Sequence, residues 1–194
     1  MKLIFTADTH FGSKFNNENT ALRNAQLVSS FDSIADYAES INAAAVLLGG
    51  DLFDTPNPSE EISAAVRRVF KRHGALRFLA VCGNHDPLNV TAFYANPPEN
   101  LYVFPDKPKG VSLGDITVFG VSISSAFDMP DPWKDFYVPA RAEESGGFIT
   151  LSHGTLGGHG GFDLNARTLA ESGAALSLLE HIHKTNVILL PGAN

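Results

Sequence analysis

The sequence is poor in cysteine, in positive charge and in long hydrophobic runs. The single cysteine, Cys82, cannot form an intramolecular disulfide, and the sequence has no cysteine cluster of the kind that binds zinc. This usage is typical of a reducing compartment, so we expect a cytoplasmic protein. The apolar start reaches Asp8 too soon for a signal peptide, and no run approaches the roughly 20 apolar residues of a membrane helix. Secretion and membrane insertion are therefore disfavoured.

Positive charge is scarce as well: 14 lysines and arginines stand against 21 aspartates and glutamates, for a formal net charge of −7. Bulk attraction to a polyanion is excluded by this balance, and contact with nucleic acid would need metal ions or a local basic patch. With 194 residues, 44% of them hydrophobic, the chain is long enough for one compact domain and short for two. We predict a single domain over residues 1–194.

Short apolar runs alternate with helical patterns. Runs typical of buried strands occupy Lys2–Ala7, Ala44–Leu48, Leu76–Val81, Ile116–Val121, Phe148–Leu151 and Val187–Leu190. Apolar residues at three- and four-residue spacing from Leu22 to Ile41 predict an amphipathic helix, and Asn57 as N-cap with Pro58 after it predicts a second helix to about Arg72. This order of elements predicts an α/β fold with helices covering a largely parallel sheet, followed by a long irregular loop over Ser124–Gly147.

Polar clusters directly follow several of the apolar runs. They are Asp8-Thr9-His10, Gly50-Asp51, Gly83-Asn84-His85-Asp86, His153-Gly154 and His181-Ile182-His183. In α/β folds, groups just beyond the carboxyl ends of strands converge on one rim. Carboxylate, imidazole and amide groups that converge there are what a pair of divalent cations needs. Taken singly, most of these clusters also fit a surface turn or a structural histidine, but together and in this order they indicate a metal site.

The order D-x-H, G-D, G-N-H-[DE], H and, with one departure, G-H-x-H resembles the signature of the calcineurin-like metallophosphoesterase superfamily over residues 3–192. Thr6–Ser13, Gly50–Asp54 and Val81–Pro87 look like the DNA-repair exonuclease branch, the SbcD type. The resemblance implies a four-layer α/β/β/α sandwich and a metal-dependent phosphodiesterase, a DNA exonuclease or endonuclease in DNA repair. A phosphodiesterase or phosphatase acting on a small molecule, and a catalytically weak binding module, stay open because a metal site defines the chemistry and not the substrate.

The resemblance also implies a ligand set. One metal would be held by Asp8, His10, Asp51 and His183, and the other by Asp51, Asn84, His153 and His181. Asp51 would be shared, and a shared carboxylate can hold two cations roughly 3.5–4 Å apart. Mn²⁺ suits these oxygen and nitrogen ligands best in this branch, with Zn²⁺, Fe²⁺, Co²⁺ or Ni²⁺ as alternatives.

Two further residues are assigned catalytic roles by the same resemblance. His85 looks like the group that protonates the leaving oxygen or stabilises the charge of the phosphorane. Asp86 would orient the ring of His85 as its carboxylate partner. DNA is the implied substrate.

The sequence departs from the family at Glu180, which stands where the family has a glycine before His181. If the glutamate points into solvent, which we expect, Glu180→Gly changes activity by less than about threefold; if it intrudes on the site, the same change raises Mn²⁺-dependent activity. Members of the branch also continue into a region that shapes DNA access and a segment that docks an ATPase partner. We expect neither after Asn194, which suggests an isolated nuclease domain or a compact relative.

Weaker candidates have a structural reading beside the functional one. Gly157–Gly161 fits a phosphate-binding loop or a flexible connector. The aromatic set around Trp133 fits base stacking or the anchoring of a loop; it also includes Phe127, Phe136 and Tyr137. A basic run fits phosphate contacts or a solvated face; it comprises Arg67, Arg68, Lys71, Arg72 and Arg77. His73 and Cys82 are predicted to be structural.

Overall fold

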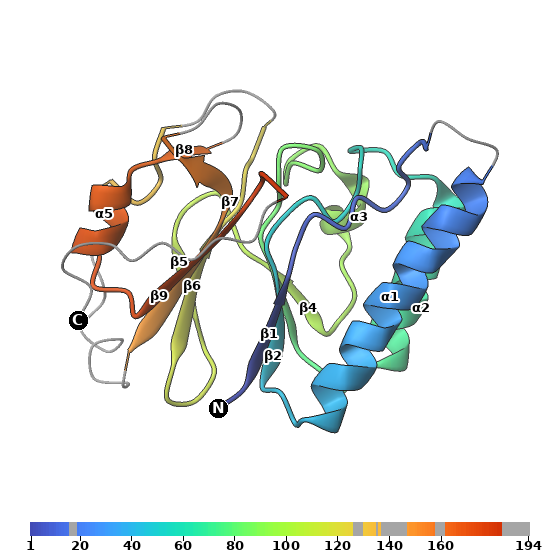
Figure 1. The fold of residues 1–194 in the computed structure, drawn as a ribbon, viewed down its shortest axis with the longest axis horizontal. Coiled ribbons are helices and arrows are strands. Elements are labelled where there is room, and N and C mark those ends of the chain that lie inside the picture. Colours follow the sequence, from blue (N-terminus) through green and yellow to red (C-terminus); the bar gives the residue numbers. More distant parts are fainter. Residues whose placement is uncertain (16–18, 126–129, 135, 137–146, 158–161, 184–194) are drawn as a thin grey trace.

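A computed structural model describes residues 1–15, 19–125, 130–134, 136, 147–157 and 162–183. Within these residues the chain forms two β-sheets that face each other, with the two long helices on the outer side of one sheet (Figure 1). Most of the predicted loop over Ser124–Gly147 and the whole predicted strand over Val187–Leu190 lie outside the described residues. No helix in the described ranges has the length and apolar character needed to cross a bilayer.

The first sheet has four parallel strands in the order β1-β2-β3-β4. Their bounds are β1 Leu3–Thr6, β2 Ala45–Leu48, β3 Phe78–Ala80 and β4 Leu101–Val103. Every residue of β2 and β3 is buried, as expected for a parallel sheet covered on both faces. The first three strands confirm the predicted runs with slightly different ends, whereas β4 was not predicted.

Two helices connect the first three strands. The first, α1, spans Thr20–Ser40 and buries Phe31, Ala35 and Ala38 against the sheet. The second, α2, spans Glu60–Arg72 and begins later than predicted, because Ser59 and not Asn57 is its N-cap. The Ser59 side chain accepts a hydrogen bond from the Ile62 backbone N–H, which satisfies one of the free donors of the first turn. A short helix, α3, follows at Ala92–Ala95.

The second sheet mixes parallel and antiparallel pairs. Its strands are β5 Lys109–Ser112, β6 Thr117–Val121, β7 Phe148–Leu156, β8 Phe162–Leu164 and β9 Leu176–Glu180. The pair β5–β6 is antiparallel, while β7 lies parallel to its three partners β6, β8 and β9. The strands β6 and β7 confirm two predicted runs, and β5, β8 and β9 were not predicted. The short helix α5 (Ala166–Glu171) packs outside this sheet through Leu169.

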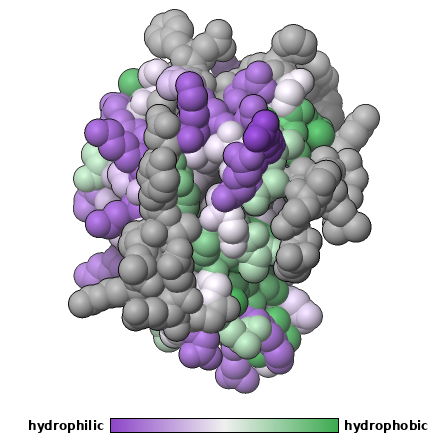
Figure 2. Space-filling model, turned by 90° about the vertical axis from the view of Figure 1, so that its left-hand side faces the viewer, coloured by the Kyte–Doolittle hydropathy of each residue, from purple (hydrophilic) through white to green (hydrophobic). Residues whose placement is uncertain are grey.

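The core is divided into three apolar clusters by the two sheets. One lies between α1, α2 and the first sheet, a second fills the space between the sheets, and a third lies on the outer face of the second sheet. Figure 2 views the molecule from the side of the second sheet, where hydrophobic residues gather in the lower middle of the face. The predicted α/β class with parallel sheets is confirmed, and the described part includes two facing sheets with helices outside (Figure 1).

Candidate metal centre

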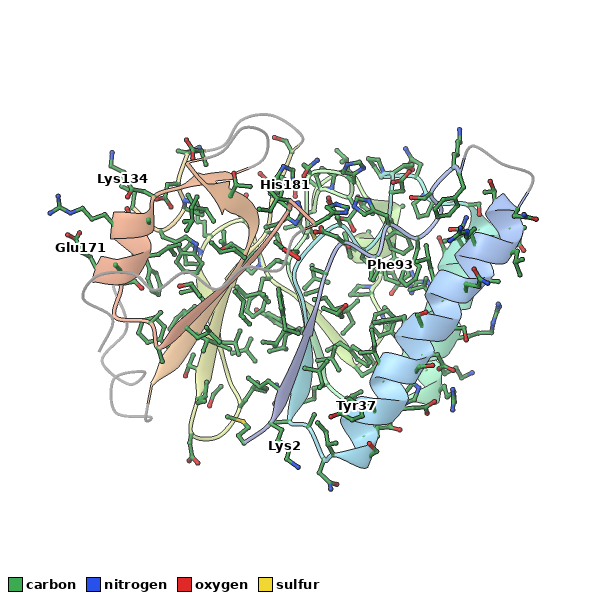
Figure 3. The ribbon with its side chains drawn as sticks, viewed as in Figure 1. Lys2, Tyr37, Phe93, Lys134, Glu171 and His181 are labelled. Carbon is green, nitrogen blue, oxygen red and sulfur yellow. The ribbon has the colours of Figure 1, made fainter. Side chains whose placement is uncertain are left out.

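Polar side chains gather at the edge where the central strands of both sheets end. They are Asp8 and His10 after β1, Asp51 after β2, Asn84 and His85 after β3, His153 within β7, and His181 and His183 after β9. Figure 3 shows His181 at this edge, in the space between the two sheets. The structure therefore brings all seven predicted ligands into one region, because the carboxyl ends of the parallel strands share an edge.

The backbone at this edge is strained. Of the five described non-glycine residues with positive φ, four are predicted ligands: Asp8 (51°), His10 (46°), Asp51 (49°) and His183 (49°). Such conformations cost about 1–3 kcal/mol each and persist only where the surrounding structure enforces them. Their concentration in one cluster indicates that the turns are shaped to aim these side chains and not for local stability.

Two motif glycines allow the ligand turns to approach one another. A Cβ on Gly50, whose φ is +104°, would lie 2.5 Å from Nδ1 of His153. A Cβ on Gly83 would lie 2.0 Å from Oδ1 of Asp51. Any side chain at either position would displace a predicted ligand, so the glycines of the G-D and G-N-H motifs have a steric role.

The first predicted ligand group surrounds Asp8. Its Oδ2 lies 3.8 Å from Nε2 of His183, and this nitrogen lies 3.3 Å from Nε2 of His10. Asp8, His10 and His183 each offer a donor atom close enough to the others for one cation. Two imidazole nitrogens that face each other at this distance need a proton or a cation between them, because two lone pairs repel.

The second group surrounds His153, which is fully buried. Its Nε2 lies 3.0 Å from Oδ1 of Asn84, 3.1 Å from Nδ1 of His181 and 3.3 Å from Oδ2 of Asp51. On the opposite side of the ring, Nδ1 lies 3.0 Å from the carbonyl oxygen of Gly49. That carbonyl can only accept a hydrogen bond, so it holds the proton on Nδ1 and leaves the Nε2 lone pair facing the cluster.

Asp51 lies between the two groups, and its carboxylate oxygens have different partners. Oδ1 accepts a hydrogen bond from the His85 backbone N–H at 2.9 Å. Oδ2 lies 3.3 Å from Nε2 of His153 and 3.8 Å from Nε2 of His10. Burial alone would raise the pKa of Asp51, but its contact with His153 holds it below the usual value. One ionised oxygen is thus directed at both groups, which is the geometry of a bridging ligand.

Unsatisfied polar atoms at the site show that it fits cations. Both carboxylate oxygens of Asp8 and Nδ1 of His10 are buried without a hydrogen-bond partner. Burial raises the pKa of Asp8 to about 6 and lowers that of His10. A buried carboxylate without donors costs free energy that a bound cation removes, and the donor set of carboxylate, amide and imidazole suits Mn²⁺ or Zn²⁺. The residues present therefore fit divalent metal ions.

His85 lies beside the two groups, and its partner differs from the one we expected. Its Nδ1 lies 3.0 Å from the carbonyl oxygen of Asp54 and 3.9 Å from Oδ1 of the same residue. Asp54 also lies 3.3 Å from Nδ1 of His10. Sequence reasoning missed Asp54, although its place three residues after Asp51 in Gly50–Asp54 was the signal available. His10, Asp51 and His85 form a further close donor group, so the geometry alone allows His85 to be a ligand or an acid.

Asp86 is fully buried and organises the backbone instead of facing the His85 ring. It accepts hydrogen bonds from the Gly83 N–H at 2.9 Å, from the Phe53 N–H at 3.0 Å and from the hydroxyl of Tyr94 in α3. Burial raises the pKa of Asp86 to about 6, and these donors oppose that rise. The carboxylate therefore joins the loop after β2 to the loop after β3, which carry Asp51 and Asn84.

We expect Asp86→Ala to lower the free energy of unfolding by about 3 kcal/mol or more, since three buried donors lose their acceptor. Urea denaturation of the metal-free protein measures this loss. Tyr94→Phe, which removes one donor and leaves the carboxylate in place, should lower it by only about 1 kcal/mol. An Asp86→Ala protein of wild-type stability that had lost activity would instead support the ring-orienting role.

Glu180 faces the metal centre and not the outer surface. It ends β9 paired with His153 of β7, and paired residues in a parallel sheet point to the same face. The preceding residues alternate accordingly, with Leu178 packed between the sheets and Leu179 packed on the outer face. The negative charge of Glu180 also contributes to the raised pKa of Asp8. The expected outward-pointing orientation is therefore not the one in the structure.

We expect Glu180→Gln to weaken Mn²⁺ binding about three- to tenfold, because a carboxylate near the site attracts cations without being one of the close donors. Isothermal titration of Mn²⁺ into both metal-free proteins measures the shift. Tighter binding by the variant would mean that the carboxylate obstructs the site, and identical curves would mean that it has no influence on the site.

The weaker candidates have structural partners where the structure describes them. Trp133 is buried, and its Nε1 donates to Oγ of Ser152 at 2.8 Å, which favours the anchoring of the loop. Arg67 stacks on Phe93, while Arg72 forms ion pairs with α1. Cys82 is buried. Three candidates lie outside the described residues: Phe127, Tyr137 and most of Gly157–Gly161.

Several known proteins with similar sequences are named as DNA repair proteins or nucleases. The chain is 29% identical over 132 residues to the DNA double-strand break repair protein Mre11 of Sulfurisphaera tokodaii, covering 62% of this chain and 33% of that protein. It is 26% identical over 203 residues to Mre11 of Sulfolobus acidocaldarius, covering 99% of this chain and 52% of that protein. It is 31% identical over 91 residues to a subunit of the nuclease SbcCD of Rhodobacter capsulatus, covering 45% and 22%. The chain spans about half or less of the length of these relatives.

The family match covers nearly the whole chain. Residues 1–192 match the family described as calcineurin-like phosphoesterase. This range includes every element described above and the complete cluster of aspartate, asparagine and histidine side chains at the edge of the sheets. The chain belongs to the calcineurin-like phosphoesterase family.

Proposed function

We propose that this protein is a two-metal phosphodiesterase that hydrolyses DNA. The observation that carries the proposal is the position of Asp51, whose Oδ2 is directed at both His10 and His153 and so joins two donor groups into one centre. Asp8, His10 and His183 would hold one cation together with Asp51. Asn84, His153 and His181 would hold the other, again with Asp51. Mn²⁺ is the metal we propose, since the ligands are oxygen and nitrogen without thiolate.

Metal ions bound there would polarise the phosphoryl group and lower the pKa of a bound water. The protein's own contribution to proton transfer comes from His85. The carbonyl oxygen of Asp54 accepts from Nδ1 of the ring and keeps that nitrogen protonated. The protonated imidazole then carries its transferable proton on Nε2, which can pass to the oxygen of the departing nucleotide. The ring is 43% exposed, so this nitrogen is open to a substrate.

DNA is proposed as the substrate because relatives that match this chain are named as the DNA double-strand break repair protein Mre11 and as part of the nuclease SbcCD. We propose that residues 1–194 form one nuclease domain with the four-layer α/β/β/α sandwich. An ATPase partner is also proposed from the SbcD-type resemblance. The acidic net charge of −7 means that bound metal ions would supply the main attraction for DNA phosphates.

Metal content and substrate preference test this proposal together. Elemental analysis after loading with Mn²⁺ should give two equivalents per chain. The loaded protein should cleave single-stranded DNA, with bis-p-nitrophenyl phosphate and cyclic nucleotides as comparison substrates. Hydrolysis of the small substrates without DNA cleavage would favour a small-molecule phosphodiesterase. Two bound metals without any hydrolysis would favour a binding module.

A further inference from the structure

A second group of metal-binding side chains lies away from the phosphoesterase centre, where the C-terminal ends of α1 and α2 meet. The α1–α2 cluster consists of Asp32, Asp36 and Glu39 of α1 and His73, the residue that caps the end of α2. The spacing of the three acidic residues places them on one face of the helix. Figure 3 shows Tyr37, which lies between Asp36 and Glu39 in α1, at the opposite end of the molecule from His181.

The His73 ring is held in one orientation. Its side chain is 1% exposed, and Nε2 lies 3.1 Å from Oδ1 of Asp32 in a hydrogen bond. An ionised carboxylate can only accept, so Nε2 carries the proton and the neutral ring presents a lone pair on Nδ1. Metal-binding histidines are commonly oriented in this way, with a carboxylate accepting from the nitrogen that does not bind the metal.

The other ring nitrogen faces a carboxylate without forming a hydrogen bond. Nδ1 of His73 lies 3.0 Å from Oε2 of Glu39, yet it is a buried atom with no hydrogen-bond partner. A lone pair and a carboxylate oxygen this close repel each other unless a cation lies between them. Two ligands bonded to one Zn²⁺ at about 2.0–2.2 Å have a comparable separation. Asp36 completes a group of three close donors with Glu39 and His73.

The charges of the cluster also call for a cation. Its three carboxylates face one guanidinium, that of Arg72, which forms ion pairs with Asp32 and with Asp36, the latter at 2.9 Å. Glu39 and Asp36 have half-exposed side chains, at 43% and 51%, so an ion can enter from solvent while the imidazole stays buried. A divalent ion would neutralise the excess charge and tie the C-terminal ends of α1 and α2 together.

We propose that His73, Glu39 and Asp36 form a structural divalent-cation site, selective for Zn²⁺, with Asp32 orienting the imidazole. It is independent of the proposed phosphoesterase function, because none of its residues belongs to that centre. The site stabilises the packing of α1 on α2, on the face of the first sheet opposite to the second sheet.

Zinc stoichiometry tests the site. Metal-free wild-type protein, Glu39→Gln and His73→Gln are dialysed against micromolar free Zn²⁺ and analysed for bound metal. We expect each variant to bind one equivalent less than wild type. Glu61→Gln, which changes an exposed carboxylate in the first turn of α2, is the matched control and should bind the wild-type number. Glu39→Gln keeps the test valid if His73→Gln fails to fold, since Glu39 lies at the surface.

Stability supplies the second measurement. Zn²⁺ should raise the urea midpoint of Asp51→Asn protein, in which the phosphoesterase centre is weakened, and adding Glu39→Gln should abolish that shift. Equal stoichiometry in wild type and Glu39→Gln, or an equal loss in Glu61→Gln, would overturn the proposal. Failure of DNA cleavage would leave these outcomes unchanged, so the two proposals are tested separately.

Discussion

Asp51→Asn is expected to lower Mn²⁺-dependent phosphodiesterase activity by more than about 10³-fold, a loss of roughly 4 kcal/mol in transition-state stabilisation. The substitution keeps the shape of the side chain and the acceptor for the His85 N–H, so the loop after β2 stays in place. It replaces Oδ2, which faces both His10 and His153, with an amide or removes its charge. Both donor groups lose their common ligand at once, so bound metal should fall with activity.

Two comparisons make this expectation specific. Asn84→Ala removes a ligand from the group around His153 alone, so it should lower the metal content by one equivalent and still abolish turnover. Asp115→Asn changes an exposed aspartate in the turn after β5 and should leave activity and metal content at the wild-type level. Circular dichroism confirms that the variants are folded. Near-normal turnover by folded Asp51→Asn would contradict the two-metal proposal.

The predicted strands are those whose residues are buried on both faces. All residues of β2 and β3 are buried, so their sequences read as continuous apolar runs. The strand β5, with the sequence KGVS, is partly exposed and lacks such a run. The strand β4 is three residues long with an exposed Tyr102 in the middle. Short edge strands depend on pairing with distant segments, which the local sequence does not record.

The start of α2 shows a similar limit. Asn57-Pro58 has the composition of a helix start, but the Asn57 N–H is bonded to the side chain of Thr55 in a local turn. Ser59 is in an extended conformation and caps the helix in place of Asn57. Both residues are good N-caps by type, so tertiary placement of the preceding loop decides between them.

At the metal centre, the sequence indicated which residues converge but not how each is oriented. Convergence followed from the position of the polar clusters after parallel strands. The partner of the His85 ring did not follow, because it is the backbone carbonyl of Asp54, and a carbonyl has no signature in the sequence. The roles of Asp86 and Glu180 likewise depend on turn geometry and strand register, since β9 was not predicted.

His85→Ala is expected to retain both metal equivalents and to lose about 10²–10⁴-fold in the hydrolysis of DNA, the usual contribution of general acid catalysis. The proposed donor is Nε2, because Nδ1 is occupied by the Asp54 carbonyl. The loss should be much smaller on bis-p-nitrophenyl phosphate, because p-nitrophenolate needs little protonation as it departs. Comparing the two substrates therefore separates proton donation from a general collapse of the site.

Metal content decides between the two positions that the geometry allows for His85. It lies in a close donor group with His10 and Asp51, so a ligand role would show as loss of metal in His85→Ala and as equal losses on both substrates. Asp54→Ala is the matched comparison. It removes the carboxylate, 3.9 Å from the ring, but keeps the backbone carbonyl that holds Nδ1. Its effect on DNA hydrolysis should be well below that of His85→Ala, since the proton donor and its orientation both remain.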